Sequence, residues 1–390
     1  MTLGLDKTTW QRVAFGDVVR NVNVSVKDPD AKGLDRVIAM EHLDPGELRI
    51  SRWGMIEDGT TFTRRVRPGQ TLFGKRRAYQ RKAAFAEFDA ITSGDILTIE
   101  AIEGRLLSEF LPFIVQSDGF YNHALGTSAG SLSPRTNWCD LATFEFDLPP
   151  LPEQQRLADL LWAVERHRTA IQQQRNMVKA AQTAWLAKDV EQLLAESATS
   201  FKTVWSRSPE SGWSAPPVDQ ITGCYVLSLA ALGPNGYRPD QLKNATDSSE
   251  LRSARLVKGD LLISRANTVD TVGRAGIFSE DRDDVSFPDT MMRIHLADDV
   301  RPAFALVVLS SPTGRAHMRR TAAGSATSMV KINRTSLGGL SFPRVSVARQ
   351  DDLLRTLHHY AVADKHCESE SVATSELQAN LSHAVFGGEQ

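Results

Sequence analysis

Several features that mark common classes of protein are scarce or missing in this chain of 390 residues. Its three cysteines, Cys139, Cys224 and Cys367, lie far apart and form no CxxC pair, which excludes a disulfide framework and a cysteine-based zinc site and fits a reducing cytoplasm. No apolar run reaches the roughly 18 residues of a transmembrane helix. The first residues lack the apolar core of a signal peptide. We therefore expect a cytoplasmic protein that does not engage a membrane.

The chain also has no large excess of charge of either sign, because it contains 45 basic and 47 acidic residues and its net charge is −2. This average does not indicate a nucleic-acid ligand, but the distribution of charge does. Residues 64–82 contain eight Lys or Arg and no acid, and residues 313–350 contain seven and no acid. The two segments predict two basic surfaces that suit a phosphate backbone, although each segment alone is equally typical of a solvated charged loop.

The chain repeats itself with an offset of about 190 residues. The segment VRPGQTLFGKRR at 66–77 matches LVKGDLLISRAN at 256–267, with Lys75 on Arg265. Weaker matches precede and follow it in the same order. A unit of this length indicates a duplicated domain rather than a solenoid, and the chain is long enough for two or three domains, each with its own core.

Each unit ends in a stretch with apolar residues at every seventh position, which predicts a long helix with a coiled-coil stripe. No Gly or Pro interrupts the first stretch between 153 and 206, and about 40 helical residues would span ~60 Å. We expect the two helices to form an antiparallel coiled coil with a mixed seam, and two helices packed on separate domains are the alternative. The stripe residues are Leu157, Leu161, Val164, Ile171, Val178 and Trp185, then Leu353, Leu357, Tyr360, Cys367, Thr374 and Leu381.

The part of the chain before each helix mixes short β-like runs with short helical ones, so the predicted fold class is α+β, with two duplicated globular domains separated by the two long helices. Strands are predicted at 95–101, 259–265 and 291–296, and helices at 106–117 and 302–320. The predicted bounds are 1–150 and 201–345 for the globular domains, and 151–200 and 346–390 for the long helices.

The sequence contains no complete motif for catalysis. The run from Gly69 approaches a P-loop, but Arg76 stands where that loop needs Ser or Thr to hold Mg²⁺. The nine histidines show no HExxH motif and no ligand spacing. LPPLP at 148–152 lacks the flanking residues of an amino-methyltransferase loop, and Pro288-Asp289 lacks the acid-x-Lys of a nuclease. We expect a binding protein that is not an enzyme and holds no cofactor or metal. A rival hypothesis is an enzyme whose site is not recognised in the sequence, for instance a Mg²⁺-dependent nuclease.

The polar residues of the two domains include the residue types that bind nucleic acid. Arginine pairs bidentately with phosphate or guanine, asparagine suits the edge of adenine, and Gly/Ser-rich loops allow a polyanion to approach closely. Each residue alone is also typical of a solvated loop, and only the groups together favour nucleic acid. The candidates are Lys75, Arg76, Arg77, Tyr79, Arg81, Lys82, Ser131 and Arg135, then Arg265, Asn267, Arg274, Ser328, Lys331 and Asn333.

With this duplicated layout and the stretch FDLPPLPEQQRLADLL at 146–161, the chain resembles the specificity subunit of type I restriction-modification systems. The resemblance covers essentially the whole chain. It departs at the second junction, where Arg349 stands in the place of Glu153 and the helix seam is more polar.

The resemblance implies that each globular domain is a target-recognition domain that reads one half of a bipartite site in double-stranded DNA. The paired helices would set the gap between the halves and dock two methyltransferase subunits. Those partners would bind S-adenosylmethionine, and restriction subunits would use ATP and Mg²⁺, while this chain would have no activity of its own. A non-catalytic assembly scaffold, whose globular domains bind protein, is the alternative.

Overall fold

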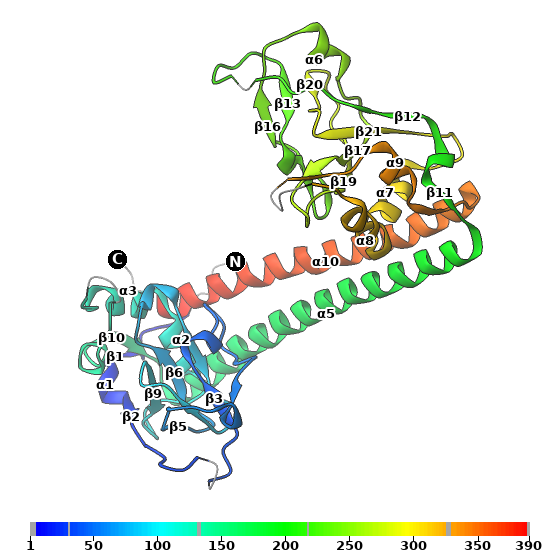
Figure 1. Ribbon diagram of the computed structural model, residues 1–390. Helices are drawn as coiled ribbons and strands as arrows, with labels where there is room; N and C mark the ends of the chain where they lie inside the picture. The colour runs from blue at the N-terminus through cyan, green and yellow to red at the C-terminus, as the bar shows by residue number, and fades with distance from the viewer. Residues whose placement is uncertain (1–4, 30–31, 131–133, 217, 325–328, 388–390) are drawn as a thin grey trace. The chain divides into compact units, whose positions relative to one another are not determined.

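The computed structural model describes residues 5–29, 32–130, 134–216, 218–324 and 329–387. The chain divides into two compact units. Unit 1 comprises Met1–Gln174 with Cys367–Gln390, and unit 2 comprises Arg175–His366. Each unit therefore contains an α+β domain together with a part of each long helix (Figure 1).

The α+β domain of unit 1 contains two four-stranded sheets and a separate strand pair. The order of the first sheet is β2-β9-β6-β7, and that of the second is β4-β3-β8-β5, in which β3 and β8 run parallel. Strand β6, with the sequence TLFG, is buried along its whole length, as its apolar residues require. The strands are β1 (Gln11–Ala14), β2 (Val19–Val22), β3 (Arg36–Ile38), β4 (Gly54–Met55), β5 (Arg64–Val66), β6 (Thr71–Gly74), β7 (Ala83–Phe85), β8 (Ala90–Thr92), β9 (Ile96–Ala101) and β10 (Glu145–Leu148), with β1 paired to β10.

Unit 2 repeats this topology, so the predicted duplication is present in the strand order. Its sheets have the orders β12-β21-β17-β19 and β16-β13-β20, again with one parallel pair, β13 and β20. The strands are β11 (Ala198–Ser200), β12 (Trp205–Ser211), β13 (Tyr225–Leu227), β14 (Leu232–Gly233), β15 (Gly236–Tyr237), β16 (Leu242–Asn244), β17 (Leu261–Ser264), β18 (Ala266–Asn267), β19 (Ala275–Ile277), β20 (Val285–Ser286), β21 (Met291–Leu296), β22 (Val330–Lys331) and β23 (Ser341–Pro343). The strands predicted at 95–101, 259–265 and 291–296 are β9, β17 and β21.

Short helices lie within both predicted segments, 106–117 and 302–320, but they are shorter than the segments because each ends at a serine. Ser117 separates α2 (Leu111–Gln116) from α3 (Asp118–Gly126), and Ser311 separates α7 (Pro302–Ser310) from α8 (Pro312–Thr321). Both serines have extended backbone and accept a hydrogen bond from the amide three residues later, which starts a new helix. The remaining short α-helices are α1 (Phe15–Val18), α4 (Trp138–Leu141), α6 (Ser249–Ser253) and α9 (Arg334–Gly338).

The two long helices are α5 (Leu151–Ser197) and α10 (Val347–Phe386), and they pair antiparallel in both units. In unit 1 His167 Nε2 lies 3.3 Å from Glu370 Oε1. In unit 2 Arg175 Nε donates to Asp364 Oδ1 at 2.8 Å, and the rings of Trp185 and Tyr360 lie 5.9 Å apart. The alternative of two helices packed on separate domains is therefore wrong.

The stripe residues differ in how deeply they are buried. Most of them are buried, and a second group, which lies entirely in unit 2, is half-buried. The buried members are Leu157, Leu161, Val164, Ile171, Leu353, Cys367, Thr374 and Leu381. The half-buried members are Val178, Trp185, Leu357 and Tyr360.

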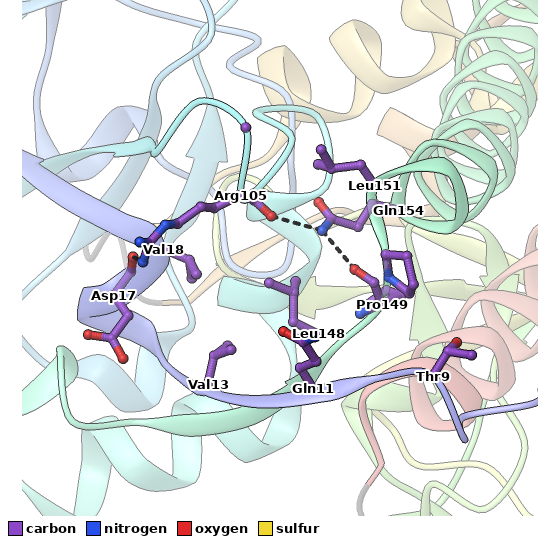
Figure 2. Close-up of a pocket in the computed structure, with 12 residues that line it drawn as sticks. Thr9, Gln11, Val13, Asp17, Val18, Arg105, Leu148, Pro149, Leu151 and Gln154 are labelled. Atoms are coloured by element: carbon purple, nitrogen blue, oxygen red, sulfur yellow. Dashed lines mark hydrogen bonds between the residues drawn. The ribbon is translucent and has the colours of Figure 1, made fainter.

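A buried glutamine fastens each long helix to the domain that precedes it. Gln154 Oε1 accepts from the amide of Leu107 at 2.9 Å, and its Nε2 donates to the carbonyl oxygens of Arg105 and Pro149, the latter two bonds being drawn in Figure 2. Two turns further on, Trp162 packs edge-on against Phe113, with ring centroids 5.1 Å apart. The start of α5 is thus part of the domain core rather than a free connector.

Candidate nucleic-acid interface

The first candidate loop follows β6 and makes a tight turn. Arg77 and Arg81 both have left-handed backbone, with φ of 53° and 51°, and they flank a 3₁₀ turn at Ala78–Gln80. Ala78 is buried, whereas Arg77 is exposed and Tyr79 is 57% exposed. The turn therefore anchors its apolar residue in the core and presents a guanidinium and a phenol ring to solvent.

This loop is hydrogen-bonded through its backbone to the second candidate loop of unit 1, although the two are distant in the sequence. The amide of Arg77 donates to the carbonyl of Pro134 at 2.9 Å, and the amide of Thr136 donates to the carbonyl of Lys75 at 2.9 Å. Arg76 and Arg135 are thereby antiparallel bridge partners. The structure thus brings together Lys75, Arg76, Arg77 and Arg135, while Ser131 lies outside the described residues.

The cations of this loop pair surround one carboxylate. Asp95 Oδ1 lies 2.8 Å from Arg76 Nε and 3.8 Å from Arg135 Nη2. Partial burial, and then the nearby guanidinium of Arg64, lower the pKa of Lys75 below its ordinary value. Cations that depress one another's protonation mark a place where an added anion is favoured.

Two residues of the predicted set are used inside the domain. Arg81 donates to Asp118 Oδ1 at 2.5 Å and to the carbonyl of Gln116 at 2.6 Å. Lys82 Nζ donates to the carbonyl of Met40 at 2.6 Å. These bonds fix the turn against α3 and the neighbouring loop, so Arg81 and Lys82 have a structural role in supporting the loop.

Unit 2 builds the same loop pair with different side chains. Strand β18 pairs antiparallel with β22, so that Ala266 lies opposite Lys331, as Arg76 lies opposite Arg135 in unit 1. The amide of Ile332 donates to the carbonyl of Arg265 at 2.9 Å, which repeats the bond between Thr136 and Lys75. The backbone frame is therefore duplicated, whereas the side chains on it differ.

The candidate side chains of unit 2 differ in how firmly they are engaged. The guanidinium of Arg265 makes long contacts, at 3.4 Å to Ser211 Oγ and 3.5 Å to the carbonyl of Asp289. Asn267 Oδ1 accepts from the amide of Thr268 at 2.9 Å. Asn333 Oδ1 accepts from the amide of Ser336 at 2.8 Å and caps α9, which gives it a structural role. Ser328 lies outside the described residues.

Helix α8, within the basic segment 313–350, carries three further arginines, Arg315, Arg319 and Arg320. Arg315 donates to the carbonyls of Val272 and Asp270 at 2.8 and 3.0 Å, which joins α8 to the loop after β18. Burial, followed by the charges of Arg319 and Arg274, lowers the pKa of Arg315. The predicted Arg274 therefore belongs to a cluster of three cations.

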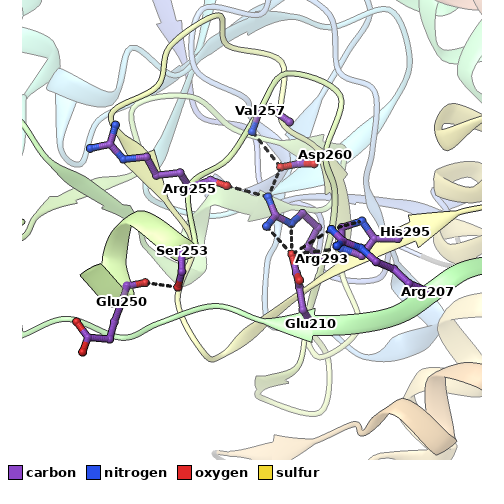
Figure 3. Close-up of polar contacts among 9 residues, drawn as sticks. All are labelled: Arg207, Glu210, Glu250, Ser253, Arg255, Val257, Asp260, Arg293 and His295. Carbon is purple, nitrogen blue, oxygen red and sulfur yellow. Dashed lines mark hydrogen bonds and ion pairs between the residues drawn. The ribbon is translucent and has the colours of Figure 1, made fainter. Parts of the chain in front are cut away.

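Another arginine of unit 2 is fully occupied within the sheet. Arg293 on β21 donates to Asp260 Oδ2 at 2.8 Å, to Glu210 Oε1 at 2.7 Å and to the carbonyl of Arg255 at 2.8 Å (Figure 3). Such a network holds strands together and occupies the guanidinium. Arg293 is therefore not a candidate for binding an anion.

Within the described ranges, no three His, Cys, Asp or Glu side chains are grouped as a metal site would require. The same residues include no helix that is both long and apolar enough to cross a membrane.

The fold thus defines a class: two copies of an α+β domain, each with a basic loop pair, combined with two long helices that pair antiparallel. Solved structures share the fold along nearly the whole chain. One is a chain of a type I R-M system studied for complex assembly and conformational transition, with a TM-score of 0.60, 18% identity, and coverage of 97% of this chain and 98% of that one. The HsdS subunit from Thermoanaerobacter tengcongensis matches with a TM-score of 0.50 and 17% identity, over 97% of this chain and 97% of that one. The S subunit of the type I restriction-modification system from M. genitalium matches with a TM-score of 0.56 and 10% identity, over 100% of both chains.

Two curated relatives agree with this likeness in sequence. The type I restriction enzyme EcoKI specificity subunit of Escherichia coli K12 is 24% identical over 231 residues, 55% of this chain and 50% of the relative. The EcoDI specificity subunit of Escherichia coli is 27% identical over 150 residues, 38% of this chain and 33% of the relative. The alignments thus span half or less of these relatives, and no family model matches the chain. In sequence and in fold, the chain resembles type I specificity subunits.

Proposed function

We propose that the chain is the DNA-recognition subunit of a type I restriction-modification complex and has no catalytic activity of its own. Residues 1–150 and 201–345 would be its two target-recognition domains, and the helices at 151–200 and 346–390 its conserved spacer. The observation that carries the proposal is the duplicated loop pair, in which the same backbone frame presents a different set of basic and polar side chains in each unit.

The loop pairs suit the two tasks of a sequence-specific DNA-binding protein. Contacts to phosphate position such a protein, and contacts to base edges specify the sequence. Exposed cations such as Arg77 and Arg319 suit the first task. Arg76, Arg265 and Asn267 lie on or next to the bridged backbones and suit the second, because arginine and asparagine match guanine and adenine. Two different sets of side chains would read two different half-sites of double-stranded DNA.

The long helices would dock the partner subunits. Large apolar side chains remain exposed on them, including Met177 at 65% and Val372 at 55%, and exposed apolar residues are favoured places for protein contact. We infer that two methyltransferase subunits with S-adenosylmethionine bind here, and that ATP- and Mg²⁺-dependent restriction subunits join them.

Methylome sequencing tests the proposal. Cells that express the chain with its methyltransferase partner should show adenine methylation at one split motif, which disappears when the gene of the chain is deleted. Exchange of the loop residues of unit 1 should change one half of that motif and leave the other half unchanged. A deletion that leaves every methylated motif in place would contradict the proposal and favour the assembly scaffold, for which reversing the charge of Arg76 and Arg77 leaves DNA affinity unchanged.

A further inference from the structure

The contact between Asp95 and Arg76 is fixed from both sides. The carbonyl of Asp95 accepts the amide of Lys75 at 2.9 Å, so the backbone of the acid is fastened to the loop that its side chain contacts. Its carboxylate then lies 2.8 Å from Arg76 Nε and within 3.8 Å of Arg135 Nη2. The carboxylate side chain is 28% exposed, whereas those of Arg76 and Arg135 are 40% and 52% exposed. The side chain of the acid is thus more covered than the two arginine side chains, which remain partly exposed.

A guanidinium that reads a base must be held in one orientation. A free arginine side chain loses roughly 2 kcal/mol of rotamer entropy when it is ordered, which weakens its preference for the correct base. The carboxylate of Asp95 lies beside Nε as an ion-pair partner, although the Nε–H is not aligned on it as a hydrogen bond, and this charge attraction restricts the side chain at an atom other than the two terminal nitrogens. Those nitrogens are the pair that binds guanine O6 and N7 together.

The second copy of the unit supports a link between the acid and the arginine. At the place of Asp95, unit 2 has Thr290, whose carbonyl accepts the amide of Arg265 at 2.8 Å. At the place of Arg76 it has Ala266, the bridge partner of Lys331. The acid and the arginine that it contacts are therefore both replaced in the copy, although the backbone frame and a cation at the place of Arg135 are kept.

We propose that Asp95 is a positioning residue that holds Arg76 for the recognition of one G·C base pair in the half-site read by unit 1. This inference rests on the proposed function. It assigns Asp95 to sequence specificity, although its negative charge opposes DNA binding.

The charge of Asp95 makes the test sharp, because positioning and simple electrostatics predict different results. Asp95→Asn removes a negative charge from a DNA-binding surface. If the carboxylate only neutralised the arginines, the variant would bind all duplexes more tightly and keep its sequence preference. If it positions Arg76, affinity for unrelated DNA stays equal or rises, while affinity for the target falls.

The experiment uses the complete complex with the methyltransferase subunits. Fluorescence anisotropy would measure affinity for a duplex of about 30 bp, roughly three helical turns, that carries the methylated motif, and for a scrambled duplex of the same composition. Methylome sequencing would read the motif in cells. We expect Asp95→Asn to lower the ratio of specific to unrelated affinity by about 10-fold or more. We also expect one G·C pair in one half of the motif to become degenerate, with the other half unchanged.

Two variants serve as controls. Asp147→Asn makes the same charge change at an acid of β10 that pairs with Arg12 at 3.4 Å and is 47% exposed, away from the loop pair, and it should leave the affinity ratio and the motif intact. Arg76→Lys keeps the charge but loses the planar fork, and it should relax the same base pair as Asp95→Asn. If Asp95→Asn is poorly folded, an unchanged affinity ratio and motif in Arg76→Lys would still overturn the inference, because Asp95 would then have no base-reading arginine to position.

Three results would overturn the inference. An unchanged ratio and motif in both Asp95→Asn and Arg76→Lys would remove Asp95 and Arg76 from base recognition while the proposed function stands. Relaxation of different base pairs by the two variants would separate the acid from the arginine. A wild-type complex without any split motif would overturn the proposed function and this inference with it.

Discussion

Gln154 in unit 1 and Gln350 in unit 2 are buried to the same degree, at 1% exposure, and make the same three kinds of hydrogen bond at the starts of α5 and α10. Gln350 Oε1 accepts from the amide of Arg301 at 2.8 Å, and its Nε2 donates to the carbonyls of Asp299 and Val345 at 2.8 and 3.1 Å. Both glutamines therefore close the loop that precedes a domain helix onto the start of a long helix, and the duplication extends to individual hydrogen bonds.

We expect Gln154→Leu to destabilise unit 1 by about 3 kcal/mol, because it leaves one buried amide and two carbonyls without their partner. Hydrogen exchange at the amide of Leu107 should accelerate, and exchange at the amide of Arg301 in unit 2 should stay slow. Gln155→Leu is the matched control, since Gln155 is exposed and bonds to Asp159 one turn along the helix. Equal effects of the two substitutions would show that the buried hydrogen bonds contribute nothing specific.

Glu165 provides a second prediction, because it is a fully buried acid on α5. Arg168 contacts it at 2.8 Å and also reaches Glu47, and these hydrogen bonds, with that to Glu47 the strongest, raise the pKa of Arg168. Arg168→Met would leave Glu165 buried without its cation. We expect a loss of about 3 kcal/mol in the free energy of unfolding, measured by urea titration.

The control for this prediction is Arg156→Met, which removes an exposed arginine paired with Glu153 at 3.1 Å. It should change the free energy by less than about 1 kcal/mol. The double variant Glu165→Met with Arg168→Met should recover part of the loss, since an apolar pair in a buried position is tolerated better than a lone charge. No recovery would mean that packing of the arginine, rather than the unpaired acid, explains the loss.

Patterns in the sequence predicted the long helices, three of the strands and the duplication. The seven-residue spacing from Leu157 to Ile171 needs only the geometry of a helix, and every member of that series is buried. The apolar runs of β9 and β21 are equally local signals. Such features could be predicted because neighbouring residues alone determine them.

Features that depend on distant partners could not be predicted in this way. Glu165 is one position beyond an apolar stripe residue, and nothing nearby in the sequence indicates that Glu47 and Gln378 complete its environment. In the sequence Arg81 belongs to a basic run, but in the structure its guanidinium donates a hydrogen bond to Asp118. The contact between Asp95 and Arg76 was missed for the same reason. Charge runs predicted where basic residues gather and did not predict which of these cations are engaged.

The dependence of stability on pH should reveal the ion pair between the long helices in unit 2. A hydrogen bond from Arg175, followed by the charge of Lys179, lowers the pKa of Asp364 below its ordinary value of 3.8. Because the folded pKa is the lower one, the stabilisation is complete above the ordinary pKa and is lost as pH falls through the folded value. Asp364→Asn should therefore lower the free energy of unfolding by less than about 1 kcal/mol at neutral pH.

This difference between wild type and Asp364→Asn should stay constant from neutral pH down to about pH 4 and shrink below it. Urea titrations at several pH values would measure it. Asp352→Asn on the same helix is the control, since Asp352 pairs with Arg355 within α10 at 3.0 Å. A difference that grows as the pH falls would have the wrong sign for a carboxylate with a lowered pKa and would exclude this pair as its source.

The cations of α8 lead to a prediction about salt dependence. Arg319 is exposed, and its charge contributes with that of Arg274 to the lowered pKa of Arg315. If this cluster binds phosphate, Arg319→Glu should weaken binding to the target and to scrambled duplexes by the same factor. The slope of log affinity against log salt concentration should become shallower by about 0.9 for each phosphate that the variant no longer neutralises.

Arg355→Glu makes the same charge change on α10, where the arginine is 64% exposed and pairs with Asp352. At 0.1 M salt and above it should leave both the affinity and the slope nearly unchanged, because long-range attraction is screened within roughly 10 Å at 0.1 M salt. If Arg319→Glu weakened binding to the target duplex alone, α8 would bind base edges rather than phosphate. If Arg319→Glu lowered DNA affinity no more than Arg355→Glu does, α8 would lie outside the DNA interface. The loop pair would then supply the cations through which unit 2 binds DNA.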